Sequence, residues 1–161
     1  MIMSRTFSLA LGAGVCALVV AGCGGGGKSG GGSTATKSSP SGATVGVKRS
    51  GLGTVLVDAK GRTLYLFEAD KTTKSTCYGA CAGVWPPLSA AGAPKAGPQV
   101  VASELGTTKR TDGTTEVTYH GHPLYYYAGD AQPGDTKGQG LDQFGAEWYV
   151  LAPSGSKIDE G

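Results

Sequence analysis

Hydrophobic and polar positions divide the chain into three parts. Residues 7–20 carry no charge, and residues 24–44 contain no aromatic and no branched aliphatic side chain. Beyond residue 44, short runs rich in β-branched and aromatic residues alternate with turns that contain glycine. Such runs predict β-strands, and together they are long enough for one small domain with its own core. We expect this domain at residues 45–153, followed by a polar tail at 154–161 that frays.

Pairs of these runs flank short turns and therefore predict hairpins. Thr54–Asp58 and Thr63–Phe67 form one pair, and Glu116–Tyr119 and Pro123–Tyr127 form another. Each pair is separated by a turn with a glycine, which adopts positive φ angles without strain. Further strands are expected at Val45–Arg49, Thr107–Arg110 and Glu147–Leu151, and the one helix expected is a turn or two near Cys77–Val84.

The two hairpin regions are copies of one another. The run from Thr54 to Asp70 aligns with the run from Thr114 to Asp130 at an offset of 60 residues. The identical pairs are Thr54/Thr114, Val57/Val117, Gly61/Gly121, Leu64/Leu124, Tyr65/Tyr125 and Asp70/Asp130, and further on Trp85 pairs with Trp148. We therefore predict an all-β fold: two tandem hairpin-based repeats, at about 45–90 and 105–153, in one small domain. A short helical turn near the two cysteines is the only other element expected.

The first 23 residues have the pattern of an exported lipoprotein. Arg5 provides a basic start, and the uncharged run after it has 14 residues, fewer than the about 20 that span a bilayer. Val20-Ala21-Gly22-Cys23 then resembles the lipobox that lipoprotein signal peptidase recognises. We predict a signal peptide at 1–22, a lipid on Cys23 and a flexible Gly/Ser tether over 23–44. An ordinary signal peptide or an uncleaved anchor is the alternative.

The charge balance bears on the partner. Without residues 1–22, Lys+Arg falls from 14 to 13 against 12 acidic residues, and the pairs Lys48-Arg49 and Lys109-Arg110 are isolated. Phosphate backbones require a concentrated basic patch, so we expect no nucleic acid as partner. The expected partner is the membrane, contacted through the lipid anchor at the extracytoplasmic face. An envelope protein or a small ligand would come in addition, and the sequence does not identify it.

Both repeats carry the motif Tyr-x-(Phe/Trp/Tyr)-x-x-Asp, as Tyr65, Phe67, Asp70 and as Tyr125, Tyr127, Asp130. With the flanks Cys77-Tyr-Gly-Ala-Cys81 and Trp85-Pro-Pro, the segment 134–140 and the lipobox, this pattern resembles the bacterial secreted-repeat lipoproteins named for that motif. The resemblance covers about Gly53 to Gly155. It implies no activity, because the family is described as being of unknown function.

The tyrosine and aspartate of each motif admit two interpretations. Aromatic residues at every second position of a strand usually belong to a core. The aspartate at the strand end would then accept backbone N–H groups of the next turn, or a tyrosine hydroxyl. The functional alternative is an aromatic-lined ligand site with the aspartate as its polar anchor.

The cysteines also admit more than one interpretation. Of four cysteines in the sequence, one leaves with the signal and one carries the lipid, so Cys77 and Cys81 remain. Two close thiols in an oxidising compartment favour a disulfide. A redox dithiol or a copper site is the alternative, with His120 or His122 as the third copper ligand.

The function suggested by the sequence is a membrane-anchored structural or binding module of the cell envelope. Residues 45–153 contain no Gly-x-Ser-x-Gly elbow, His-Glu-x-x-His pair or phosphate loop, so we do not expect an enzyme. No cofactor is expected. The competing class is a copper-binding or thiol redox protein that uses Cys77, Cys81 and His120 or His122.

Overall fold

The computed structural model describes residues 42–159, and these residues confirm the predicted all-β fold. They form short strands, one α-helix and one 3₁₀ helix. The predicted signal peptide, Cys23 and nearly all of the predicted tether lie outside the described residues. Within residues 42–159, no helix is long and apolar enough to cross a membrane.

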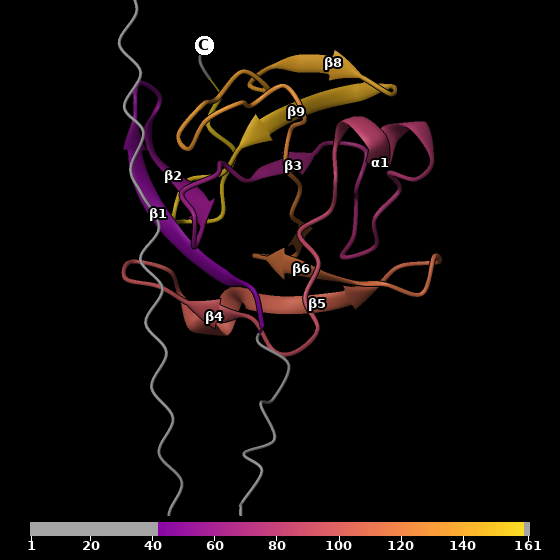
Figure 1. Ribbon diagram of the computed structural model, residues 1–161, viewed down its shortest axis with the longest axis horizontal. Helices are drawn as coiled ribbons and strands as arrows, with labels where there is room; N and C mark the ends of the chain where they lie inside the picture. Colours follow the sequence, from indigo (N-terminus) through magenta and orange to yellow (C-terminus); the bar gives the residue numbers. More distant parts are fainter. Residues whose placement is uncertain (1–41, 160–161) are drawn as a thin grey trace, which may run out of the picture. The chain divides into compact units, whose positions relative to one another are not determined.

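The strands form three small sheets (Figure 1). In the first sheet, β1 (Thr44–Ser50) lies between β2 (Gly53–Asp58) and β4 (Lys95–Ala96). In the second, β9 (Ala146–Val150) lies between β3 (Tyr65–Phe67) and β8 (Leu141–Gln143). In the third, β6 (Thr115–Tyr119) lies between β5 (Leu105–Lys109) and β7 (His122–Pro123). All pairs are antiparallel except β1 with β4. The helix α1 is Ala80–Val84, and the 3₁₀ helix η1 is Ala102–Glu104.

The predicted hairpins are present but short. In the first repeat β2 meets the next run only at the bridge between Val57 and Thr63, and in the second β6 meets β7 at two positions. The longer pairings are those of β2 with β1 and of β6 with β5. The run expected as a strand at Pro123–Tyr127 continues beyond β7 only as a bridge at Tyr125. In each repeat, the second predicted strand therefore leaves its own hairpin after the first one or two residues.

The two repeats exchange their last segments. The end of the second repeat, β9, pairs with β3 of the first, and Leu56 of β2 donates its N–H to Leu151 at 2.9 Å. The end of the first repeat, residues 85–90, lies against the second: Leu88 donates to Leu124 at 2.7 Å and accepts from Val117 at 2.8 Å. Each repeat thus completes the backbone hydrogen bonding of the other.

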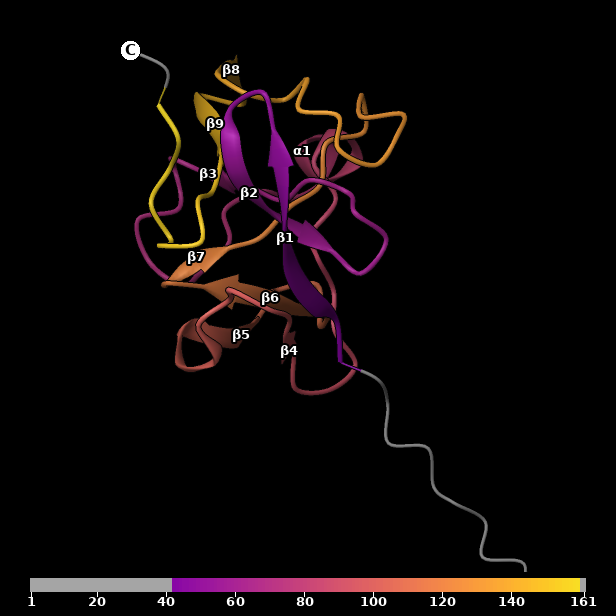
Figure 2. The ribbon, with the colours of Figure 1, turned by 90° about the vertical axis from the view of Figure 1, so that its left-hand side faces the viewer.

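This exchange produces two buried clusters. One contains Val45, Leu56, Leu64, Leu66, Leu88, Val117, Tyr119, Leu124, Tyr149 and Leu151. The other contains Val55, Val57, Tyr65, Phe67, Cys77, Cys81, Trp85, Tyr125, Trp148 and Val150. Both clusters draw side chains from both repeats, so neither repeat has a core of its own. Figure 2 shows β5, β6 and β7 at one end of the domain, away from β8 and β9.

The segment after residue 153, which we expected to fray, is folded at least as far as Ile158. Its main chain turns back on β9, so that Ile158 donates its N–H to Val150 at 2.9 Å. Gly155 has a φ of 83°, a backbone conformation that glycine adopts without strain. The strands β4 and β8 were also not predicted. They are two and three residues long, too short to show an alternating pattern.

Candidate functional site

The tyrosine of each repeat motif donates its hydroxyl hydrogen to the aspartate of the other repeat. Tyr65 Oη lies 2.7 Å from Asp130 Oδ2, and Tyr125 Oη lies 2.5 Å from Asp70 Oδ2. The two tyrosines are neighbours at the centre of the domain, since each also donates its backbone N–H to the carbonyl of the other, at 2.9 and 3.0 Å. The motif therefore joins the two repeats.

The second carboxylate oxygen of each aspartate holds the loop that follows it. Asp70 Oδ1 accepts the backbone N–H and the hydroxyl of Thr76, at 2.7 and 2.6 Å. Asp130 Oδ1 accepts the backbone N–H of Lys137 at 2.9 Å. Each aspartate thus has both of the structural partners considered from the sequence, a loop N–H and a tyrosine hydroxyl. Only the repeat of origin of the tyrosine could not be foreseen.

Burial keeps these phenols neutral. The pKa of Tyr65 lies far above its ordinary value, because the ring is buried and because its hydroxyl donates to Asp130. The pKa of Tyr125 is raised in the same way by burial, by the charge of Glu116 and by the hydrogen bond to Asp70. Burial also raises the pKa of Asp130, against the opposing effect of the Tyr65 hydroxyl. Both tyrosines are therefore hydrogen-bond donors and not nucleophiles at neutral pH.

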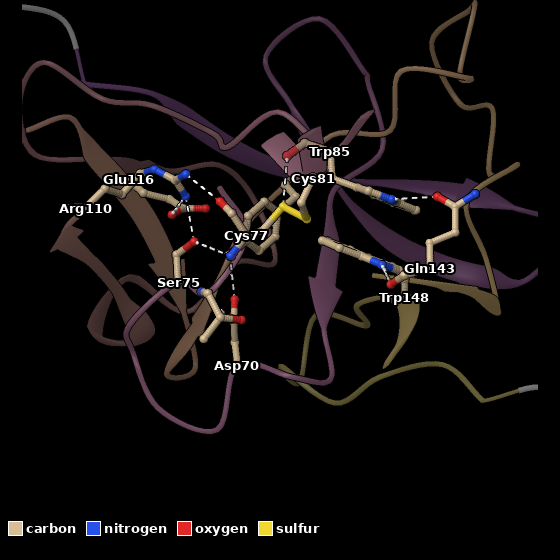
Figure 3. The surroundings of a disulfide bond; sticks show 11 residues. Asp70, Ser75, Cys77, Cys81, Trp85, Arg110, Glu116, Gln143 and Trp148 are labelled. Carbon is tan, nitrogen blue, oxygen red and sulfur yellow. Dashed lines mark hydrogen bonds and ion pairs between the residues drawn. A yellow bond between two sulfur atoms is a disulfide. The ribbon is translucent and has the colours of Figure 1, made fainter. Parts of the chain in front are cut away.

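The aromatic residues of the two repeats form one stacked column. Trp148 stacks on Phe67 and on Trp85, with both centroid distances 4.0 Å, and the far side of Trp85 contacts Tyr127 at 4.5 Å. Both indole N–H groups donate to Gln143, one to its side chain and one to its main chain (Figure 3). Both tryptophans are fully buried. The rings therefore stack on one another and leave no free indole face for a ligand.

Cys77 and Cys81 form a disulfide beside this column (Figure 3). Their Cα atoms are 5.2 Å apart, and both residues are buried. The bond closes the loop that enters α1, and Trp85 at the end of α1 donates its backbone N–H to Cys81 at 2.7 Å. The disulfide thus fixes the segment that carries Trp85 into the core.

A buried ion pair lies next to the disulfide loop. The guanidinium of Arg110 donates to Glu116 Oε2 at 2.8 Å, to Ser75 Oγ at 2.6 Å and to the carbonyl of Cys77 at 2.6 Å. The side chains of Arg110 and Glu116 are both fully buried. Ser75 also donates its hydroxyl hydrogen to Tyr125 Oη at 2.7 Å, since Tyr125 donates its own to Asp70, and this contact connects the ion pair to Asp70. We call Asp70, Ser75, Arg110, Glu116 and Tyr125 the buried polar network.

The carboxylate of Glu116 is the least satisfied group of this network. Among the residues that the structure describes, its Oε1 has no hydrogen-bond partner. Burial raises the pKa of Glu116 to about 7, and the charge of nearby Asp70 adds to this effect, although Arg110 opposes it. Protonation of this side chain is therefore more favourable than protonation of an exposed glutamate.

Arg110 and Glu116 belong to no sequence motif, but one signal in the sequence indicates them. At the offset of 60, Glu116 stands where the first repeat has Leu56, and Arg110 stands where it has Ser50. Leu56 is fully buried. A carboxylate at the position of a core leucine indicates a buried charge, which requires a cation as partner.

The two histidines belong to a surface pocket that contains neither cysteine of the disulfide. His120 and His122 line a surface pocket together with Asp70 and Lys157. The cysteines of the proposed copper site are oxidised to a disulfide, whereas copper binds thiolates. Across residues 42–159, no group of three or more His, Cys, Asp or Glu side chains is placed to hold a metal ion. The copper or redox alternative is therefore not favoured.

Comparison with known proteins agrees with the internal repeat. A family model described as a secreted repeat of unknown function matches residues 46–89 and 106–152, one match for each repeat. No curated protein and no solved structure matches the chain. The matched segments contain both predicted hairpins, both copies of the motif and the loop with the disulfide. The chain belongs to the family of secreted repeats of unknown function.

Proposed function

We propose that this protein is a lipoprotein anchored through Cys23, which holds its β domain at the extracytoplasmic face of the cell membrane as a binding module. The observation that carries the proposal is the lipobox Val20-Ala21-Gly22-Cys23, which follows an uncharged run of 14 residues. The Gly/Ser-rich segment after Cys23 leads directly to β1, which begins at Thr44.

Two features of the domain support this role. A buried disulfide between Cys77 and Cys81 suits an oxidising compartment outside the cytoplasm. The tyrosines and aspartates of both motifs and the tryptophans are engaged with one another inside the domain. Their work is structural, so a binding role would use the surface of a stable scaffold and not the motif itself.

The anchor is tested with a Cys23→Ala variant in cells fed labelled palmitate. The wild-type protein should take up the label and sediment with membranes. The variant should remain unprocessed or be released without label, because only a thiol at this position carries the thioether-linked glyceride.

Cys16→Ala is the matched control, since Cys16 lies within the predicted signal peptide. This variant should be labelled like the wild type. A mature wild-type protein that begins elsewhere than at Cys23 and carries no lipid would contradict the proposal.

A further inference from the structure

A surface pocket of about 380 Å³ lies where the turn of the second repeat meets the motif strand of the first. Its walls include Phe67, Lys71, His120, His122, Ser156 and Lys157. We call it the histidine pocket. The protein has two histidines in all, and both line this pocket.

An equivalent pocket lies where the turn of the first repeat meets the motif strand of the second. A pocket of about 200 Å³ is lined by Arg62, Tyr126, Tyr127 and Asp130, and we call it the arginine pocket. At the offset of 60, Arg62 corresponds to His122, and the other three correspond to Leu66, Phe67 and Asp70 of the histidine pocket. The exchange of strands has therefore built the same concavity twice, each time from the turn of one repeat and the motif strand of the other.

In the arginine pocket the cation is already paired. Arg62 Nε lies 2.9 Å from Asp58 Oδ2, and its guanidinium lies 3.9 Å above the ring of Tyr126. Tyr126 also donates its hydroxyl to Asp58, at 3.1 Å. Although burial opposes it, hydrogen bonds from Arg62 and Lys60 lower the pKa of Asp58, so this carboxylate stays ionised. The protein's own side chains thus satisfy the polar groups of this pocket.

The histidine pocket has no equivalent of Asp58 or of the Tyr126 ring. Thr118 stands at the position of Asp58, and Leu66 stands at the position of Tyr126. The half-buried ring of His122 accordingly makes no hydrogen bond within the described part of the chain; burial and neighbouring His120 lower its pKa, while Asp70 opposes them. A neutral imidazole still offers one N–H donor.

The acids of the histidine pocket, by contrast, are engaged. Glu68 Oε1 lies 2.8 Å from Lys157 Nζ, and both oxygens of Asp70 accept hydrogen bonds from Tyr125 and Thr76. His120 Nδ1 lies 3.1 Å from Glu104, at the outer side, and Lys71 is exposed at the rim. Among the described residues, His122 and Lys71 keep donors that no other side chain of the pocket engages.

We propose that the histidine pocket binds a small oxyanion, a carboxylate or a phosphate, through His122, His120 and Lys71. Hydrogen bonds to a charged acceptor are stronger than those between neutral groups, which favours an anion over an alcohol or an amide. The side chains of Leu66 and Phe67 add an apolar wall. This inference deepens the binding role proposed above. It rests on that proposal only in assuming that the surface of the domain binds a ligand.

The two histidines make the test direct, because their imidazole proton signals are the only ones of that kind in the NMR spectrum. The purified protein is titrated with sodium benzoate, with sodium phosphate, and with benzyl alcohol as the uncharged match to benzoate. At least one anion should shift the His122 signals to saturation, and benzyl alcohol should not. Which of the two anions binds decides between a carboxylate and a phosphate ligand.

His122→Ala should weaken anion binding about ten-fold, followed through His120, because it removes one charge-assisted hydrogen bond. Lys60→Ala changes the residue of the first repeat that corresponds to His120 at the offset of 60, and it should leave binding unchanged. The proposal is overturned if sodium chloride of equal ionic strength produces the same shifts, if benzyl alcohol binds as well as the anions, or if His122→Ala binds them normally. Lipid attachment does not enter this measurement, so the anchor and the pocket can fail separately.

Discussion

The two repeats have the same motif and strand order but treat the same interior positions differently. The first repeat places Ser50 and Leu56 where the second places Arg110 and Glu116. Leu56 packs in an apolar cluster, whereas Glu116 is paired with Arg110, whose guanidinium also donates to Ser75 and to the carbonyl of Cys77.

The difference shows which positions the shared architecture requires. Tyrosine and aspartate are needed in both copies, because each closes a hydrogen bond to the other repeat. The interior position 56/116 tolerates either an aliphatic side chain or a carboxylate with its own counter-ion. The buried ion pair of Arg110 and Glu116 therefore occurs in the second repeat only, next to the disulfide loop.

Among the variants considered, removal of the Arg110 guanidinium should reduce the stability of the protein most. Arg110→Ala leaves Glu116 buried without a counter-ion and should lower the free energy of unfolding by about 3–5 kcal/mol. The double variant Arg110→Ser, Glu116→Leu gives the second repeat the residues of the first and should recover part of that loss, since an apolar pair can replace a buried ion pair. Chemical denaturation measures both. A double variant that is no more stable than the single one would show that the ion pair is required by the fold.

The two aspartates sharpen the comparison at the motif. Sequence equivalence predicts equal effects, but Asp70 is buried and accepts three hydrogen bonds, whereas Asp130 is half-buried and accepts two. Asp70→Ala should cost about 3 kcal/mol and Asp130→Ala about 1 kcal/mol, because a buried group that loses its partner is costlier than an exposed one. Urea melts of the two variants decide. Equal losses would mean that exposure does not separate the two sites.

The disulfide belongs to the first repeat alone. Replacing both Cys77 and Cys81 by Ser should lower the free energy of unfolding by about 2 kcal/mol, from the loop entropy restored to the unfolded chain. Intact mass of the native protein should show the oxidised pair, with free thiols only after denaturation and reduction. Native protein with two reactive thiols and stoichiometric copper would instead revive the metal-binding alternative.

The smallest effect concerns the proton on Glu116. Its pKa of about 7 in the folded protein lies above its ordinary value of 4.5, so between these values the folded state binds more protons than the unfolded state. The free energy of unfolding should therefore fall as the pH rises through this window, by up to about 1.4 kcal/mol per pH unit from this group. Glu116→Gln should remove that slope, and Leu56→Met, at the equivalent position, should retain it. A slope unchanged in Glu116→Gln would place the proton elsewhere.

Much of the fold could be predicted from local patterns. The strands β1, β2, β5, β6 and β9 to within two residues at each end, the helical turn and the proximity of Cys77 and Cys81 depend on residues near one another in the sequence. The offset of 60 follows from comparing two segments of the same sequence. Alternation, turn glycines and identity between copies report such local preferences directly.

Only the tertiary structure decided how the copies combine. Two copies with equivalent strands can pair within themselves or with each other, and the strand pattern is the same in both cases. The choice depends on long-range backbone pairing and on burial, here the pairing of β3 with β9 and the stack of Trp85 on Trp148. From that choice follow the partner of each tyrosine, the burial of Arg110 and Glu116, and the one pocket whose histidine is left unpaired within the described residues. A sequence states which side chains are equivalent, but packing across the two copies determines which of them meet.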